Sequence, residues 1–216
     1  MDARAHWESI YQRRQPDEVS WFQREATLSL RLIRENTSTS ERVLDVGGGA
    51  STLVDGLMAS GYRSVSVLDL SQSALDRARS RMGPEAPKVK WIHADILVVE
   101  LPRHSVDVWH DRAVFHFLVE AESRERYISQ VKRTIRPHGL VLMATFADDG
   151  PTQCSGLPVQ RYSPEQLHSA LGAEFVLVSS HYELHVTPQG ATQSFVYCVC
   201  RHEPASSDRS VARVTT

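Results

Sequence analysis

Residues 42–51 read RVLDVGGGAS, a short apolar run that leads directly into three glycines. Val43, Leu44 and Val46 are typical of a strand that is buried on both faces. Glycines allow a backbone to approach a ligand closely, and the helix expected over 52–59 would begin with unpaired N–H groups. A strand, a glycine turn and a helix in this order predict a cofactor-binding loop.

The spacing of the glycines does not fully match a dinucleotide-binding loop. The GxGxxG pattern, begun at Gly47, is met at Gly49 but has Thr52 in the third glycine position. The alternative pattern is an acidic residue at the strand end followed by GxGxG, and Asp45, Gly47 and Gly49 meet it, with the small Ser51 in the last position. The loop therefore matches the dinucleotide pattern incompletely and also meets the alternative pattern.

A second carboxylate follows at the end of the next apolar run. Asp69 lies 22 residues after Gly47, the usual distance for a residue that binds the hydroxyls of a ribose. This spacing is shared by several nucleoside cofactors, so it indicates a ribose without identifying the cofactor.

Five motifs in one order resemble the class I S-adenosylmethionine-dependent methyltransferases. They are VLDVGGGAS at 43–51, LDLSQSALDRAR at 68–79, HADI at 93–96, DVWHDRAVFHFL at 107–118 and RPHGLVLM at 136–143. In style they are closest to the thiopurine and tellurite methyltransferase-like group and to the methyltransferase type 11, 12 and 25 groups. The resemblance implies S-adenosyl-L-methionine as cofactor and S-adenosyl-L-homocysteine as product.

The hydrophobic pattern predicts an α/β fold. Strands are expected near 42–46, 64–69, 89–93, 106–110 and 139–146, separated by helices near 52–59, 72–82 and 121–135. Such alternation predicts a parallel sheet with helices on both faces. A further helix over 163–172 precedes two extended runs, 175–186 and 194–201, which are expected to pair antiparallel. The resemblance implies that they complete a Rossmann-like, doubly wound sheet of seven strands in the order 3-2-1-4-5-7-6, the last antiparallel.

We expect three regions along the chain: a helical and aromatic lid over 1–41, a methyltransferase domain over 42–202, and a disordered tail over 203–216. Trp7 and Tyr11 share a helix face, and Trp21 and Phe22 follow. A sulfonium is attracted to aromatic faces, and the transferring methyl group must be kept from water. The alternative is that these aromatic residues form only a hydrophobic layer on the sheet.

The resemblance assigns the cofactor contacts. Asp95 would accept a hydrogen bond from the adenine amino group, and Ile96 would pack on the ring. Asp45, an acid inside an apolar strand, must be satisfied by backbone donors or by the ammonium of the cofactor. The residues expected to bind the cofactor are Trp7, Tyr11, Trp21, Asp45, Gly47, Gly48, Gly49, Asp69, Leu70, Asp95, Ile96 and His110.

The segment after the fourth strand is the expected catalytic region, since ligands of open α/β sheets bind beyond the carboxyl ends of the strands. It resembles the family segment in which an acidic and a basic residue lie beside the methyl group, and here these are Asp111 and Arg112, with Ala113 in place of the usual glycine. Arg112 could instead bind an anionic substrate or pair with Asp111. His116 is either a general base or a hydrogen-bonded core residue.

The acceptor is expected to contact Phe22, Arg112, His116, Cys154 and His185. In the simpler interpretation, Cys154 is a small buried hydrophobic residue and His185 lies on the surface of a hairpin. If Cys154, His116 and His185 converged, they could bind a soft ion. No spacing in the sequence requires this, and no metal site is predicted.

Composition excludes several classes of protein. The chain has 216 residues, 41% of them hydrophobic, and a formal net charge of −2 with scattered basic residues, so we expect no nucleic-acid partner. Three cysteines without CxxC spacing favour a reducing compartment, the cytoplasm. No long apolar run or signal-like start is present, so neither membrane insertion nor export is expected. A monomer or a homodimer is expected.

The sequence therefore predicts a methyltransferase that moves a methyl group by in-line displacement to a small nucleophilic acceptor, such as a thiol or chalcogen compound. One alternative is a protein lysine N-methyltransferase, because the family features also occur among enzymes that modify lysines. A second alternative is a non-catalytic, cofactor-binding regulator.

Overall fold

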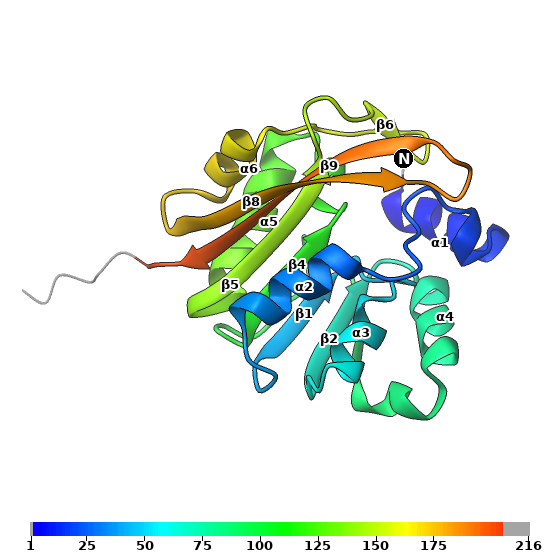
Figure 1. The fold of residues 1–216 in the computed structure, drawn as a ribbon, viewed down its shortest axis with the longest axis horizontal. Coiled ribbons are helices and arrows are strands. Elements are labelled where there is room, and N and C mark those ends of the chain that lie inside the picture. Colours follow the sequence, from blue (N-terminus) through cyan, green and yellow to red (C-terminus); the bar gives the residue numbers. More distant parts are fainter. Residues whose placement is uncertain (1, 205–216) are drawn as a thin grey trace, which may run out of the picture.

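The computed structural model describes residues 2–204, which form an α/β fold around a seven-stranded sheet (Figure 1). The order of the strands is β3-β2-β1-β4-β5-β9-β8. Strands β1 to β5 are parallel, while β9 pairs antiparallel with both β5 and β8. The strands are β1 Arg42–Val46, β2 Ser64–Asp69, β3 Lys90–His93, β4 Val106–Arg112, β5 Ile135–Phe146, β8 Phe175–Val186 and β9 Thr192–His202.

This topology confirms the predicted order of seven strands. The two remaining strands, β6 Gln153–Cys154 and β7 Leu157–Pro158, form a separate small hairpin, so that β8 and β9 are the sixth and seventh strands of the main sheet. The predicted tail falls largely on residues 205–216 and lies outside the described part of the chain.

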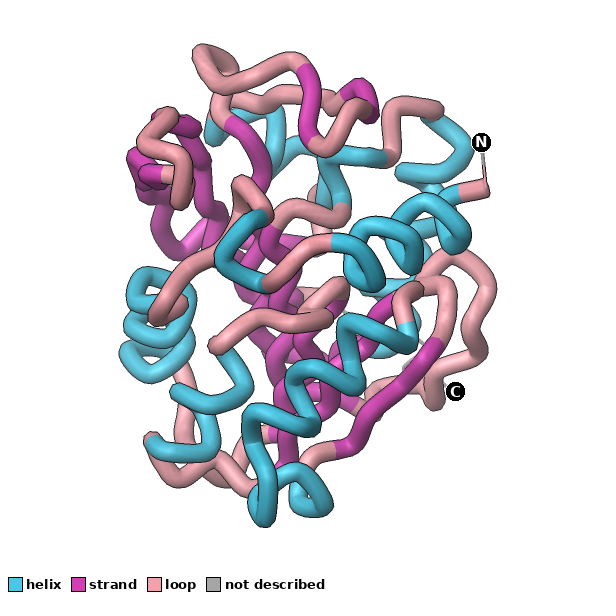
Figure 2. The backbone as a smooth tube through the Cα atoms, turned by 90° about the vertical axis from the view of Figure 1, so that its right-hand side faces the viewer, coloured by secondary structure: helices cyan, strands magenta, loops and turns pink. Residues whose placement is uncertain are grey.

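Helices cover both faces of the sheet because residues along each central strand alternate between two cores (Figures 1 and 2). In β1, Val43 packs with helices α2 to α4, whereas Leu44 packs on the opposite face with α5 and α6. The helices are α1 Ala3–Arg13, η1 Pro16–Glu18, α2 Thr27–Asn36, α3 Leu53–Ala59, α4 Gln72–Met82, η2 Gly83–Lys88, η3 Phe115–Phe117, α5 Ala121–Thr134 and α6 Pro164–Leu171.

Helix ends follow the expected capping residues. Ser71 caps α4 by accepting a hydrogen bond from the Ala74 N–H, and Ser163 forms a capping box at the start of α6. Gly83 and Gly172 end these two helices with positive φ angles of 53° and 94°. The beginning of α4 is thereby fixed next to the end of β2, where the cofactor-binding carboxylate is expected.

Two strand boundaries differ from the prediction. Strand β4 continues for two residues beyond 110, since Asp111 and Arg112 pair with Met143 and Ala144 of β5. Strand β5 begins at Ile135 and not near 139, because Ile135 pairs with Val106 across an irregularity in the register. Apolar periodicity cannot show such pairings, which are made with a distant part of the chain.

Several hydrogen bonds anchor the N-terminal segment to the rest of the fold, among them those of Glu8 and Ser20. On α1, the Glu8 carboxylate accepts hydrogen bonds from the Ser71 Oγ at 2.7 Å and the Ser73 N–H at 3.2 Å, at the start of α4. After η1, the Ser20 carbonyl accepts a hydrogen bond from the His185 Nε2 on β8 at 2.7 Å. These contacts hold residues 3–23 across the carboxyl ends of the parallel strands.

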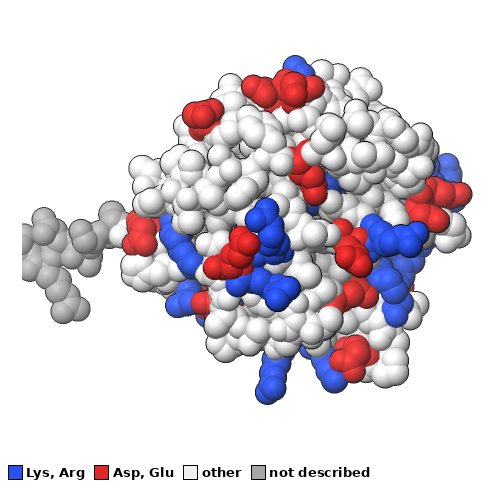
Figure 3. Space-filling view, viewed as in Figure 1, with Lys and Arg blue, Asp and Glu red and all other residues white. Residues whose placement is uncertain are grey.

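The charged side chains on the outer surface do not indicate a binding partner. On the face shown in Figure 3, acidic and basic side chains are interspersed. No helix within residues 2–204 has both the length and the apolar character needed to cross a membrane. Cys154, Cys198 and Cys200 are free and buried.

The Glu8 anchor predicts a pH-dependent attachment of α1. Burial raises the pKa of Glu8, but hydrogen bonds from Ser73 and Ser71 outweigh burial and lower the pKa to about 2, below the ordinary 4.5. The attachment is therefore fully present above pH 4.5 and lost as the pH falls toward 2. At pH 7, E8Q should raise amide exchange in residues 3–13 by roughly fivefold, the scale of one lost hydrogen bond. Hydrogen-exchange mass spectrometry measures this, with R4Q at an exposed residue of the same helix as control, and equal rates in E8Q and the parent protein would contradict it.

Candidate functional site

The glycine loop lies against two buried carboxylates. A Cβ built on Gly48 would lie 2.4 Å from the Asp45 Oδ2, and one on Gly49 would lie 2.7 Å from the Asp69 Oδ2. Gly47 has a φ of 66°, and a Cβ there would lie 2.0 Å from the Val114 Cγ2. Since no side chain fits at these positions, the loop backbone comes close to both carboxylates and is open to a ligand.

Asp45 is held by an imidazole from the neighbouring strand. The His110 Nδ1 lies 2.6 Å from the Asp45 Oδ1, and the His110 Nε2 lies 2.9 Å from the Ser29 Oγ on α2. All three residues are almost fully buried. The second oxygen, Oδ2, has no hydrogen-bond partner among the described residues. Asp45 thus retains an unused acceptor beside the glycine loop.

Asp69 and Asp95 lie at the carboxyl ends of β2 and β3, as predicted. The Asp69 Oδ1 accepts a hydrogen bond from the Ser71 N–H at 2.8 Å, and the Asp95 Oδ1 accepts one from the Leu97 N–H at 2.8 Å. Burial, with the charge of Asp45 contributing, raises the pKa of Asp69 to about 7. A buried carboxylate with so few donors is suited to a ligand that brings hydroxyl groups to it.

A cavity of about 230 Å³, here called the main cavity, runs along these strand ends. Gly47, Asp69 and Asp95 border one end of it, and Phe146 and Phe195, from β5 and β9, border the other. Other residues that line the main cavity are Trp7, Tyr11, Trp21, Leu70, Ile96, Leu97, Arg112, Ala113, Val114, Phe117, Leu118, Cys154 and Leu157. Most of the predicted cofactor-binding residues are therefore brought together around one space.

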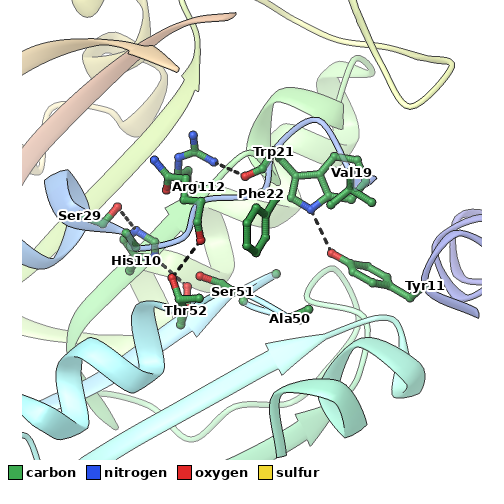
Figure 4. A pocket seen from close by; sticks show the side chains of 15 residues that line it. Tyr11, Val19, Trp21, Phe22, Ser29, Ala50, Ser51, Thr52, His110 and Arg112 are labelled. Carbon is green, nitrogen blue, oxygen red and sulfur yellow. Dashed lines mark hydrogen bonds and ion pairs between the residues drawn. The ribbon is translucent and has the colours of Figure 1, made fainter. Parts of the chain in front are cut away.

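A smaller cavity of about 60 Å³, the loop cavity, lies beside the glycine loop (Figure 4). Asp45, Gly48 and His110 line it from the sheet, while Phe22 and Ser29 line it from the N-terminal segment. The structure thus places Phe22, predicted to contact the acceptor, beside the glycine loop and away from the apolar end of the main cavity.

Aromatic residues of the N-terminal segment cover the main cavity. The Trp7 ring meets the Phe117 ring edge to face at 4.9 Å between centroids, and the Trp21 ring at 5.6 Å. The Trp21 Nε1 donates a hydrogen bond to the Tyr11 hydroxyl at 3.2 Å (Figure 4). Aromatic faces that exclude water suit a bound sulfonium.

Arg112 lines both cavities, yet its charge is already balanced. Its Nε donates to the Tyr197 hydroxyl at 2.9 Å, and its Nη2 lies 3.3 Å from the Glu183 Oε2. The Tyr197 hydroxyl also donates to the Glu183 Oε2 at 2.8 Å, and the guanidinium lies 4.2 Å from the centre of the Phe195 ring. Arg112 therefore pairs with Glu183 and not with Asp111.

Asp111 is turned away from both cavities. Its carboxylate accepts hydrogen bonds from the N–H groups of Val114 at 2.8 Å and Phe115 at 3.0 Å, and from the Tyr127 hydroxyl. Burial raises the pKa of Asp111 to about 6. These bonds hold the turn at Ala113, whose φ is 72°, and so place Val114 beneath Gly47.

His116 and His185 do not line either cavity. His116 is fully buried, and burial together with the charge of Arg112 lowers its pKa to about 3, so its ring is neutral at pH 7. His185 donates to the Ser20 carbonyl as described. Cys154 alone of the three reaches the main cavity, and burial raises its pKa to about 11. Residues 2–204 hold no group of three or more His, Cys, Asp or Glu side chains placed to bind a metal.

Sequence reasoning missed three polar residues of the site. Ser29 lies in the first turn of α2, and Glu183 and Tyr197 lie on β8 and β9. A serine on the apolar side of a helix and a carboxylate within a strand are signals that the sequence did contain. Their partners are far away in the chain: Ser29 is 81 residues from His110, and Glu183 and Tyr197 are 71 and 85 residues from Arg112.

Comparison with known proteins finds methyltransferases. Residues 43–139 match a family model described as a methyltransferase domain. The eEF1A lysine and N-terminal methyltransferase of Bos taurus is 26% identical over 137 residues, which are 63% of this chain but 19% of that protein. An uncharacterized methyltransferase of Mycobacterium tuberculosis is 32% identical over 108 residues, 48% of this chain and 50% of that protein. The chain thus spans about a fifth of the length of the first of these relatives.

Solved structures share the fold. The 1,6-didemethyltoxoflavin-N1-methyltransferase of Burkholderia thailandensis, solved with its substrate and S-adenosylhomocysteine, has a TM-score of 0.72 and 19% identity, over 92% of this chain and 86% of that one. A SAM-dependent methyltransferase of Anabaena variabilis has a TM-score of 0.73 and 16% identity, over 94% and 96% of the chains.

The residues present fit S-adenosylmethionine. The free Asp45 Oδ2 is an acceptor for an ammonium, and the glycine loop has no room for side chains that would block a ligand. Asp69 stands where a ribose would bring two hydroxyl groups. The matching family model and the shared fold support the resemblance: residues 43–139 match a methyltransferase domain, and the described residues have the fold of the class I S-adenosylmethionine-dependent methyltransferases.

Proposed function

We propose that the protein transfers a methyl group from S-adenosylmethionine to a small, neutral acceptor with a soft nucleophile, of the thiol class. The observation that supports this is the apolar end of the main cavity, which is bordered by Phe146, Cys154, Leu157 and Phe195. Among the described residues around the main cavity, the acidic ones are Asp69 and Asp95, and both belong to the opposite end.

The chain has a residue for each part of the cofactor. Asp69 would accept hydrogen bonds from the ribose hydroxyls, and Asp95 and Ile96 would contact the adenine. Asp45 would hold the amino group. When bound, S-adenosylmethionine supplies a methyl group on a sulfonium, so its leaving group is built in. The protein has to align the acceptor behind that methyl group and exclude water, and Trp7 on the covering segment serves the second purpose.

The absence of a placed base favours a thiol over an amine. A lysine ammonium must lose a proton before it can attack, while a thiol with an ordinary pKa near 8.5 supplies thiolate near neutral pH without a strong base. Asp111 and His116 were the sequence candidates for that role, and both are buried away from the main cavity.

A protein lysine is the second candidate acceptor. The relatives named eEF1A lysine and N-terminal methyltransferase favour it, although they match this chain over only 63% of its length. The main cavity has no acidic side chain at its apolar end among the described residues, and such a side chain would be needed to receive a lysine ammonium. We therefore rank the thiol class first.

Replacing Asp69, the carboxylate proposed to bind the ribose, should weaken cofactor binding and stabilise the folded protein without cofactor. D69N should weaken the binding of S-adenosylhomocysteine by roughly tenfold or more, the scale of a hydrogen bond to a charged group. Because the folded pKa of Asp69 is raised from 3.8 to about 7, its ionisation costs stability as the pH rises through that range. Without cofactor, D69N should therefore melt at a higher temperature than the parent protein at pH 8, and this difference should vanish near pH 4.

Titration calorimetry and thermal melts at the two pH values measure both effects. The control is D76N, which removes an exposed carboxylate on the neighbouring α4. An unchanged affinity in D69N would remove Asp69 from the cofactor site. Binding of a nicotinamide dinucleotide in place of S-adenosylhomocysteine would overturn the proposed cofactor.

Filling the apolar end of the main cavity should block the acceptor and spare the cofactor. In L157W the indole would occupy space beside Cys154 and Phe195, so kcat/KM for a small thiol should fall at least about tenfold while the affinity for S-adenosylhomocysteine stays unchanged. The control is L184W, since Leu184 is exposed on β8, away from both cavities. The assay follows S-adenosylhomocysteine formed with a panel of aliphatic and aromatic thiols.

The same assay separates the candidate functions. Labelled methyl groups that enter the lysines of added protein, with no product from thiols, would favour the lysine methyltransferase. Cofactor binding without transfer to either kind of acceptor would favour a regulator.

A further inference from the structure

A buried hydrogen-bond chain connects the N-terminal segment to the glycine loop. It runs from Ser29 on α2, through His110 on β4, to Asp45 on β1, with distances of 2.9 Å and 2.6 Å (Figure 4). We propose that Ser29 and His110 are positioning residues, which hold Asp45 so that its free oxygen faces the amino group of the cofactor. This inference rests on the proposed function.

The chemistry of the three groups fixes the direction of the chain. A carboxylate oxygen can only accept, so the His110 Nδ1 carries a proton and donates it to the Asp45 Oδ1. In the neutral imidazole the Nε2 then accepts from the Ser29 hydroxyl. Asp45 thus sets which ring nitrogen donates to it, and the Ser29 hydroxyl fixes the orientation of the ring through its contact with Nε2.

The geometry leaves one oxygen of Asp45 available. Its Oδ1 is taken by His110, while its Oδ2 has no partner among the described residues and lies 2.4 Å from the position of a Cβ on Gly48. Both Asp45 and Gly48 line the loop cavity. The free oxygen therefore lies under the loop, at the place where the amino-acid part of the cofactor would enter.

Ser29 also connects Asp45 and His110 to the N-terminal residues that cover the two cavities, here called the covering segment. It is 1% exposed and sits in the first turn of α2, which follows the segment that lines the loop cavity with Trp21, Phe22, Gln23 and Ala26. A second contact of the same kind is the Thr52 hydroxyl, which donates to the Gln23 carbonyl at 3.2 Å. Because a buried hydroxyl without a partner is costly, Ser29 is best satisfied when the covering segment is in place.

The test compares two ligands that differ only at the amino group. S-adenosylhomocysteine carries the α-amino group, and its deamino analogue has hydrogen there. The parent protein should prefer S-adenosylhomocysteine by about tenfold or more, measured by competition. In S29A this preference should shrink several-fold, chiefly through weaker binding of S-adenosylhomocysteine, with the deamino analogue little affected. T27A, on the exposed side of the same helix, should keep the full preference.

Two variants of His110 add a rescue. H110L removes the donor to Asp45 and should abolish the preference, whereas H110N retains an N–H donor near the Nδ1 position and should restore part of it. In H110N the additional S29A change should have no further effect on the preference, because the link to Ser29 is already broken.

Each result decides between the possibilities. Equal losses for both ligands in S29A and H110L would show a purely structural role and overturn the inference, while the proposed function would stand. An unchanged preference in every variant would likewise overturn it. A parent protein that binds neither ligand would overturn the proposed function itself.

Discussion

The site depends on the close approach of a bare backbone to two buried carboxylates. Gly48 and Gly49 pass so near to Asp45 and Asp69 that a single methyl group on either would collide with an oxygen. The helix that follows the loop can begin where it does only because the turn is this tight. Strands β1 and β2, the loop and the start of α4 are thereby fixed relative to one another, and the cavities lie where they meet.

Three buried aspartates share this region and have different roles. Asp111 accepts hydrogen bonds from two backbone N–H groups and from a tyrosine hydroxyl, and these bonds stabilise a turn, so its carboxylate is not available to a ligand. Asp45 is half satisfied, by His110. Asp69 accepts a hydrogen bond from the Ser71 N–H, and burial raises its pKa to about 7, so a ligand that donates hydrogen bonds would stabilise its ionised form. The hydrogen bonds of the three carboxylates thus distinguish their roles.

Local signals predicted the fold and the cofactor end of the site. The alternating apolar runs predicted a parallel sheet with helices on both faces, and the family resemblance implied its strand order. Asp69 and Asp95 were placed because each lies at or just after the end of a strand. The acceptor end was harder. His116 looked available in the sequence but lies in the core, and Arg112 looked like a partner of Asp111 but pairs with Glu183. Neighbours in a strand point to opposite faces, so Asp111 and Arg112 diverge, and their true partners come from elements that periodicity cannot bring together.

The two ends of the main cavity are built by different parts of the chain. The cofactor end comes from β1 to β3, while the apolar end comes from Phe146, from the β6–β7 hairpin and from Phe195 on β9. Selection can therefore act on one end without disturbing the other. Changes within residues 146–195 could alter the methyl acceptor without altering the residues at the cofactor end. Two proteins with a recent common ancestor could therefore differ in the acceptor that they methylate.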